Sequence, residues 1–238
     1  MRFGEPYRVA RCGTADIEVP AGAEIIIEGE ILANVHEPEG PFSEFTGYAS
    51  FRSTQNIFVA KRLRMRQDAI FHSVVSGMSQ DHILVSCITR EGEILTLRRN
   101  LPNVKAVHVP HNTCGAFMAF ISMKKTSAGE PQQAIMAALG TEFYTKYVIV
   151  VDDDVDIFNL ADVMWAVATR VRAEKDIVFI PGAKGAILDP TSDSEDFTLT
   201  KMGIDATKPL GRDFATRLTI SEEQRARVRG ILAKAGLN

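Results

Sequence analysis

The first third of the chain alternates hydrophobic and polar positions with a period of two. Over 23–32, isoleucines alternate with glutamates, although Ile26 breaks strict alternation, and this pattern is typical of a strand with one buried face. The range 55–66 repeats this pattern, and 69–75 is a further strand candidate beyond a Gln67-Asp68 turn. We therefore expect residues 1–77 to form a β-rich domain.

From Ser79 onward, the apolar positions recur at helical spacing and then in short continuous runs. The pattern predicts helices over 80–99, 131–139 and 160–172, and strands over 104–109, 117–123, 147–151 and 177–180. Helices alternating with buried strands are typical of a layered α/β domain, which we place at 78–216. No clear periodicity is visible over 182–208.

The C-terminal segment 217–238 is expected to be a charged helix over 221–235. Ser221-Glu222-Glu223-Gln224 is close to a capping box, in which the first and fourth side chains bond each other's backbone N–H groups. Because this helix follows a long irregular stretch, it is available for contact with another subunit, although docking on its own domain is the simpler alternative. The expected fold class is α/β (α+β): a β-rich segment, an α/β layer domain and a C-terminal helix.

Composition excludes several classes of protein. The 238 residues are 45% hydrophobic and 24% charged with a formal net charge of −3, so no nucleic-acid partner is indicated. The three cysteines share no close spacing, which fits a reduced, cytoplasmic setting. No apolar run approaches the roughly 20 residues that a membrane helix needs.

The best candidate for chemistry is the stretch 39–48, where Glu39 and Glu44 stand five residues apart across Gly40-Pro41. In a straight strand an odd separation points two side chains to opposite faces, and the Gly-Pro break can re-aim one of them. Converging carboxylates push their proton affinities apart. The alternative is a surface turn with solvated glutamates. A semi-buried site is favoured by the neighbouring aromatic residues, Phe42, Phe45 and Tyr48.

Two further segments allow alternative interpretations. The acidic run 152–156 follows the buried strand 147–151 and could bind Mg²⁺, as in a metal-dependent transferase, or could cap the next helix and pair with arginines. In 201–208, two lysines around Gly203 could hold an anion, or the segment could be an ordered loop that packs against the core.

Several separate segments together resemble the UbiD family of decarboxylases, which use a prenylated flavin. The matching segments are 20–29, 39–48, 144–156, 162–166, 168–170 and 201–207. They occur in the family's order and span nearly the whole chain. The chain resembles the second half of a family member and begins inside the flavin-binding split β-barrel.

The resemblance implies roles for five residues. Glu44 would be the proton donor, and Glu39 would pair with a catalytic arginine of the missing first half. Phe45 would form one wall of the substrate pocket, and Ala186 and Leu188 would form a second wall. The small side chain of Ala186 implies a larger or differently shaped substrate.

The resemblance also implies the cofactor and the partners. The chain would be a (de)carboxylase component acting on an aromatic or α,β-unsaturated carboxylic acid. Prenylated FMN, with a divalent metal and K⁺, would bind only in complex with a subunit that carries the first half and its metal-binding residues. A hetero-oligomer, a homo-oligomer or both are expected. The alternative is a non-catalytic assembly or regulatory subunit whose β-rich segment completes a partner's barrel.

Overall fold

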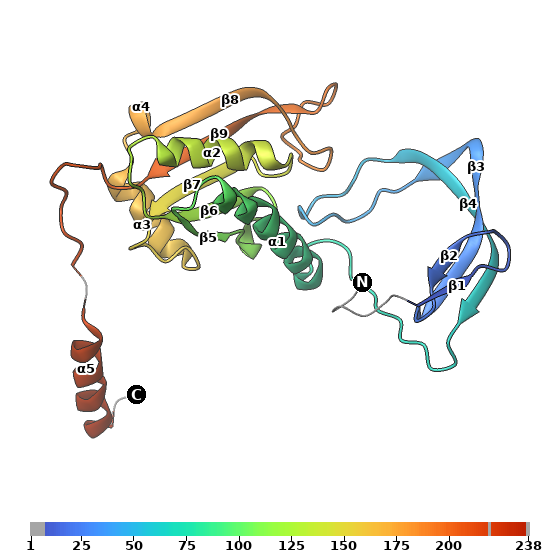
Figure 1. Cartoon of the computed structure of the whole chain (residues 1–238), viewed down its shortest axis with the longest axis horizontal. Coiled ribbons are helices and arrows are strands. Elements are labelled where there is room, and N and C mark those ends of the chain that lie inside the picture. Colours follow the sequence, from blue (N-terminus) through green and yellow to red (C-terminus); the bar gives the residue numbers. More distant parts are fainter. Residues whose placement is uncertain (1–7, 219, 237–238) are drawn as a thin grey trace.

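The computed structural model describes residues 8–218 and 220–236 of the chain. Figure 1 shows a β-rich N-terminal part, a central body in which helices cover a sheet, and a C-terminal helix set apart from that body. The whole is a mixed α/β fold, as the hydrophobic pattern predicts.

The N-terminal part consists of two antiparallel strand pairs. β1 (Val9–Arg11) pairs with β2 (Glu18–Pro20), and β3 (Ile25–Glu39) pairs with β4 (Ser53–Met65). The pairing of β3 with β4 shifts register after Glu28 and after Ile31, as it does at β-bulges that bend and twist a ribbon.

The prediction of a strand over 69–75 is wrong, because no strand forms there. Ala69 N–H donates to the Arg66 carbonyl and Ile70 N–H donates to Glu24, which turns the chain away from β4. A strand requires a neighbour for its backbone groups, and the sequence pattern alone does not show whether one is present. The apolar run stays exposed, with 77% of Phe71 accessible.

The two faces of the β3–β4 ribbon differ in chemistry. The cross-strand pairs Ile25–Met65, Ile27–Leu63 and Ile31–Phe58 place apolar side chains on one face, which we call the apolar ribbon face. The opposite face carries charged side chains and is partly covered by the loop between β1 and β2. The apolar ribbon face is exposed: the accessible fractions of Ile27, Ile31 and Leu63 are 56%, 67% and 63%.

The central body is a five-stranded sheet, and Figure 1 shows helices on both of its faces. Its strand order is β5 (Val104–His108), β6 (Met118–Met123), β7 (Tyr147–Asp152), β9 (Thr198–Ala206) and β8 (Ile177–Lys184). The three inner strands run parallel, and the two edge strands run antiparallel to their neighbours. A sheet buried on both faces explains the continuous apolar runs of β6 and β7.

Two apolar clusters fill the layers. One lies beneath α1 (Gln80–Leu95), its 3₁₀ extension Thr96–Arg99, and α2 (Glu130–Thr141). The other lies beneath α3 (Leu160–Arg170), which is followed by the short α4 (Ala173–Asp176). Successive residues of β6 alternate between the clusters, so Phe120 faces α3 whereas Ile121 faces α1 and α2. This alternation is the period of two expected of a strand.

Strand β9 corrects the expectation that 182–208 lacks regular structure. β8 continues to Lys184, past a register shift between Ile180 and Ala183, and β9 occupies most of the segment in which two lysines suggested a loop. Its hydrophobic pattern is obscured because it buries a charged side chain, Lys201, and lacks a side chain at Gly203. At Gly203 a Cβ would lie 2.0 Å from Ile135 Cγ2, so glycine allows α2 to pack on the sheet.

The C-terminal helix α5 (Glu222–Lys234) confirms the predicted helix and its capping box. Ser221 Oγ accepts from Gln224 N at 3.2 Å, and the Gln224 side chain accepts from Ser221 N at 3.0 Å. Figure 1 shows α5 beyond a connecting segment and away from the sheet. Among the described residues, no helix combines the length and apolarity required to cross a membrane.

Candidate active site

The two candidate acids lie at the tip of the β3–β4 hairpin. Glu39 is the last residue of β3, and Gly40 follows with φ +78, a conformation that favours glycine. The tip is closed by Ser50 N–H, which donates to the Phe42 carbonyl at 2.7 Å. Glu44 N–H donates to the Tyr48 carbonyl at 2.9 Å. The Gly-Pro break therefore separates Glu39 on the strand from Glu44 in a tight turn.

Phe45 anchors this tip to the central body. Its side chain is 6% exposed and lies among the rings of His82, Phe117 and Tyr144, with centroid distances of 5.9, 5.7 and 5.9 Å. Aromatic pairs at these separations add to the stability gained from burial. Thr46 is also buried. The backbone on either side of Phe45 is thereby held against the sheet domain, and Glu44 with it.

The expected aromatic enclosure is only partly present. Phe42 is 52% exposed and Tyr48 is 64% exposed, so Phe45 alone of the three is buried. Glu44 is partly buried and Glu39 is exposed. Within residues 8–218 and 220–236, neither carboxylate has a side-chain hydrogen bond or an ion pair. Both acids are therefore available to groups outside the described chain, and enclosure of the site would require a further surface.

A small cavity of about 40 Å³ lies between the hairpin tip and the loop that joins β8 to β9. From the tip it is lined by residues that include Glu44, Tyr48 and Phe51, and from the loop by Ile187, Leu188 and Pro190. Of the five predicted site residues, Glu44 and Leu188 are thus brought together. Ala186 is 1% exposed and does not line this cavity, nor do Glu39 and Phe45.

The size of this cavity limits what can bind directly beside Glu44. A volume of about 40 Å³ accommodates roughly one water molecule. A flavin does not fit in it. The cavity beside Glu44 is therefore not by itself a flavin site.

Carboxylates of the acidic run 152–156 pair with basic side chains. This agrees with the interpretation in which the run pairs with arginines. Arg170 donates to Asp152 at 2.8 Å and to both oxygens of Asp154 at 2.9 Å. Lys208 Nζ bonds Asp154 at 3.0 Å. Burial raises the pKa of Asp154, but the hydrogen bonds from Arg170 and Lys208 outweigh it and leave this pKa below its usual value. Among the described residues, no group of three His, Cys, Asp or Glu is arranged to hold a metal ion.

A further arginine contact lies beside this network of ion pairs. Arg217 pairs with Asp162, and its guanidinium stands 4.0 Å from the centroid of the Trp165 ring. A cavity of about 540 Å³ opens here, lined by Trp165, Arg170 and Arg217 among other residues. These cations already have carboxylate partners. Arg217 therefore holds the segment after β9 on α3 through Asp162 and Trp165.

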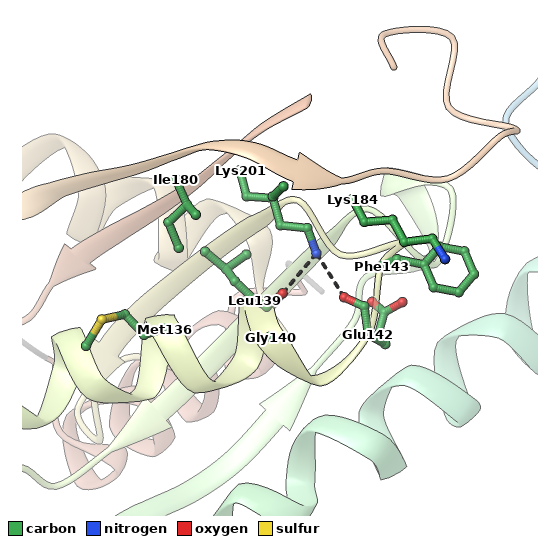
Figure 2. A pocket seen from close by; sticks show the side chains of 9 residues that line it. Met136, Leu139, Gly140, Glu142, Phe143, Ile180, Lys184 and Lys201 are labelled. Atoms are coloured by element: carbon green, nitrogen blue, oxygen red, sulfur yellow. Dashed lines mark hydrogen bonds between the residues drawn. The ribbon is translucent and has the colours of Figure 1, made fainter. Parts of the chain in front are cut away.

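Lys201 is a structural residue. It is 3% exposed, and Nζ donates at 2.9 Å to the carbonyls of Leu139 and Glu142, at the end of α2. Figure 2 shows these two bonds at the centre of a groove between α2 and β8. Burial lowers the pKa of Lys201, while Glu142 opposes the shift. A cation that satisfies the last carbonyls of a helix is favourable, so the idea of an anion-binding loop at 201–208 is not supported.

Sequence reasoning missed one buried pair near the cavity. Lys146 immediately precedes β7, and Asp189 lies in the loop between β8 and β9; their side chains are 9% and 1% exposed. Lys146 Nζ lies 2.7 Å from Asp189 Oδ2. A lysine next to a continuous apolar run was the only available signal, because the partner lies 43 residues away.

Two family models together match most of the chain. Residues 2–79 match the 3-octaprenyl-4-hydroxybenzoate carboxy-lyase Rift-related domain, UbiD. Residues 83–206 match the C-terminal domain of the same carboxy-lyase, UbiD_C.

Curated relatives are decarboxylases of about twice this length. The anhydromevalonate phosphate decarboxylase of Methanothermobacter thermautotrophicus is 37% identical over 203 residues, covering 85% of this chain and 47% of the relative. The phenolic acid decarboxylase of Bacillus subtilis is 38% identical over 213 residues, covering 87% of this chain and 44% of the relative. The chain thus spans about half the length of the curated relatives it matches.

This chain also spans about half the length of the solved structures that it matches. The UbiD-class enzyme HmfF from Pelotomaculum thermopropionicum, in complex with FMN, matches with a TM-score of 0.85 and 37% identity, over 95% of this chain and 51% of that one. The closed form of vanillic acid decarboxylase from Sedimentibacter hydroxybenzoicus matches with a TM-score of 0.77 and 30% identity, over 97% of this chain and 50% of that one.

Proposed function

Because this chain belongs to the UbiD family of carboxy-lyases, we propose that it is the acid-bearing component of a UbiD-class decarboxylase. The observation that carries the proposal is the position of Glu44. Glu44 lines a cavity together with Leu188, and the adjacent Phe45 anchors it to the sheet domain. An acid that is positioned in this way and has no partner among the described residues suits a proton donor.

The proposed substrate is an aromatic or α,β-unsaturated carboxylic acid. The relatives named for phenolic acid and vanillic acid support this class. The apolar side chains of Ile187 and Leu188 beside Glu44 also suit an unsaturated or aromatic carbon skeleton. Ala186 and Phe45 would support these walls from behind, since both are buried.

The proposed reaction breaks the bond between the carboxylate and the adjacent carbon, and releases CO₂. That carbon keeps the electron pair and takes a proton, which Glu44 would supply from a carboxyl oxygen. Glu39 would pair with an arginine of the other half of the enzyme and orient it toward Glu44. Decarboxylation also requires an electron sink, which the other half must bring.

The proposed partner is a polypeptide that carries the first half of the family fold. The apolar ribbon face exposes large side chains on a two-stranded ribbon, and such ribbons need further strands or a covering layer for stability. The chain covers only about half of its relatives. We therefore interpret residues 8–75 as part of a split β-barrel that the first half completes, with a domain boundary near residue 77.

Enclosure by this partner would also form the cofactor site. Prenylated FMN, with a divalent metal and K⁺, is proposed to bind in the complex and not to this chain alone. Solved HmfF structures contain FMN or prFMN, whereas the cavity beside Glu44 holds about 40 Å³. This chain would contribute Glu44, the wall at Leu188 and the exclusion of water from one side.

Helix α5 is proposed to contact a second copy of the chain. Its turns expose Val228, Ile231 and Leu232 on one side, with accessible fractions of 52%, 57% and 40%. Residues spaced three and four apart form a stripe along a helix. A lone helix of this length is marginal in water without packing, so a partner surface is required to stabilise it.

The test is reconstitution with the first-half polypeptide and prenylated FMN. Wild-type protein is expected to release CO₂ from an aromatic or α,β-unsaturated acid, and Glu44→Gln should lower turnover at least about 100-fold, because general acid catalysis contributes roughly 10²–10⁴. Glu37→Gln, at an exposed glutamate on β3, the strand that leads to the hairpin tip, is the matched control and should keep wild-type turnover.

Assembly must be measured beside activity, by size-exclusion chromatography and flavin absorbance. Unchanged turnover in Glu44→Gln would contradict the assigned role. A wild-type complex that assembles and loads the flavin but releases no CO₂ from any tested acid would favour the non-catalytic assembly subunit.

A further inference from the structure

The ion pair of Lys146 and Asp189 lies directly behind the loop wall of the Glu44 cavity. Lys146 Nζ donates to Asp189 Oδ1 at 2.9 Å and to Thr191 Oγ1 at 2.8 Å. Leu188 and Pro190, the two neighbours of Asp189, both line the cavity. The loop thus turns one side chain inward to the ammonium group and the adjacent ones toward Glu44.

Asp189 organises the loop around itself. Its Oδ1 accepts from Thr191 N at 2.9 Å and from Thr191 Oγ1 at 2.8 Å, and its backbone N–H donates to the Ala186 carbonyl at 2.9 Å. Ser192 Oγ donates to the same carbonyl at 3.1 Å. Burial raises the pKa of Asp189, but the bonds from Lys146 and Thr191 outweigh it and hold this pKa below its usual value. The wall is therefore built on a charged carboxylate.

Lys146 is in turn fixed to the sheet. Its backbone N–H donates to the Phe117 carbonyl at 3.0 Å, and its carbonyl accepts from Met202 N at 2.8 Å. Its ammonium group lies 4.8 Å from the centroid of the Phe117 ring, and that ring packs on Phe45 beneath the hairpin tip. One side chain therefore connects the loop wall to the support of Glu44.

We propose that Lys146 and Asp189 are positioning residues that hold the Leu188 wall at a set distance from Glu44 and so determine which acids the site accepts. This inference rests on the proposed function of the Glu44 site. Removing one member of a buried pair leaves an uncompensated charge, so the loop has to move, take up water or bind a proton. In each case Leu188 loses its fixed position.

The experiment compares Lys146→Met, Asp189→Asn and the double variant with the wild type, in the full chain and in the reconstituted complex. Hydrogen exchange of the amides in 185–192 is expected to accelerate at least tenfold in Lys146→Met. The ratio of kcat/KM for a bulky acid to that for a small acid should change at least tenfold, while kcat for the small acid changes little. The double variant removes both charges, so it keeps the test valid if a single variant does not fold.

Arg170→Met is the matched control. Arg170 is a buried cation with carboxylate partners at the opposite end of the parallel strands, and its side chain is 1% exposed. Its replacement should lower stability but leave exchange in 185–192 and the substrate ratio unchanged. A general loss of stability is thereby distinguished from a local change at the wall.

Two results would overturn the inference: wild-type exchange in 185–192 for the folded double variant, or the same change in the Arg170→Met control. An inactive wild-type complex would refute the proposed function instead. Exchange in the full chain would still decide whether the ion pair holds the wall, because that measurement does not require turnover.

Discussion

Glu28 is a buried carboxylate whose hydrogen-bond donors favour its charged form. Glu28, with a side chain 2% exposed, accepts hydrogen bonds of 2.8 Å from Gly13 N, Thr14 N and Thr14 Oγ1, and pairs with Arg64 at 2.7 Å. Burial raises the pKa of Glu28, but the bonds from Thr14 and Gly13, with Arg64, outweigh it, so this pKa lies below its usual value. The charge of Glu28 thus fastens the β1–β2 loop to the ribbon.

This arrangement predicts a pH dependence. A carboxyl whose folded pKa is lowered stabilises the folded state above its unfolded pKa, about 4.3 for glutamate, and that contribution is lost as the pH falls through the folded pKa. The hydrogen-exchange protection factors of the Gly13 and Thr14 amides should therefore decrease as the pH is lowered below about 4.3. In Glu28→Gln they should be lower throughout and lose this dependence. Equal acid sensitivity in both proteins would contradict the assignment.

At the scale of elements, the contact of α2 with β9 shows how a strand without a clear pattern is held in the sheet. β9 pairs with β7 in parallel and with β8 in antiparallel orientation, so both of its edges are bonded. Gly203 leaves room for Ile135 of α2, and Lys201 binds the last carbonyls of the same helix. Helix α2 therefore contacts β9 through a glycine and a lysine.

Gly203→Ala is expected to destabilise the central body by about 1–3 kcal/mol, the typical effect of overpacking a core, because the new Cβ would meet Ile135 Cγ2 at 2.0 Å. Urea unfolding followed by fluorescence of Trp165, which stands on α3, measures this. Ile135→Ala provides the compensating change. If the double variant is as unstable as the sum of the two single variants, steric conflict at this contact is not the cause.

At the scale of the molecule, Figure 1 shows the β3–β4 ribbon and helix α5 on opposite sides of the sheet domain, and each carries exposed apolar side chains. The apolar ribbon face is assigned to a first-half partner, and the stripe on α5 to a second copy. Neither surface is covered within the described chain. Exposed apolar patches of this kind mark interaction sites.

Sedimentation of two variants, alone and mixed with the first-half polypeptide, separates these assignments. Leu63→Lys should prevent association with the first half and leave self-association intact, because it places a charge in the apolar ribbon face. Leu232→Lys should have the opposite effect through α5. If both variants lose the same association, the two surfaces are not independent, and one of the assigned partners is wrong.

What could be inferred from the sequence was local. The helices that became α1, α2, α3 and α5 and the buried strands β6 and β7 were visible because periodicity and capping depend on residues within a few positions of each other. The stretch with Glu39 and Glu44 was recognisable for the same reason, and Glu44 and Leu188 were named through a family resemblance.

The tertiary structure decided every feature that depends on a distant partner. It made a strand of 198–206, which has neighbours on both edges, and left 69–75 irregular. It buried Phe45 among rings of the central body but left Phe42 and Tyr48 exposed, and it joined Lys146 to Asp189. Burial and ion pairing depend on which segments pack together. The hydrophobic pattern of one segment does not identify the segment against which it packs.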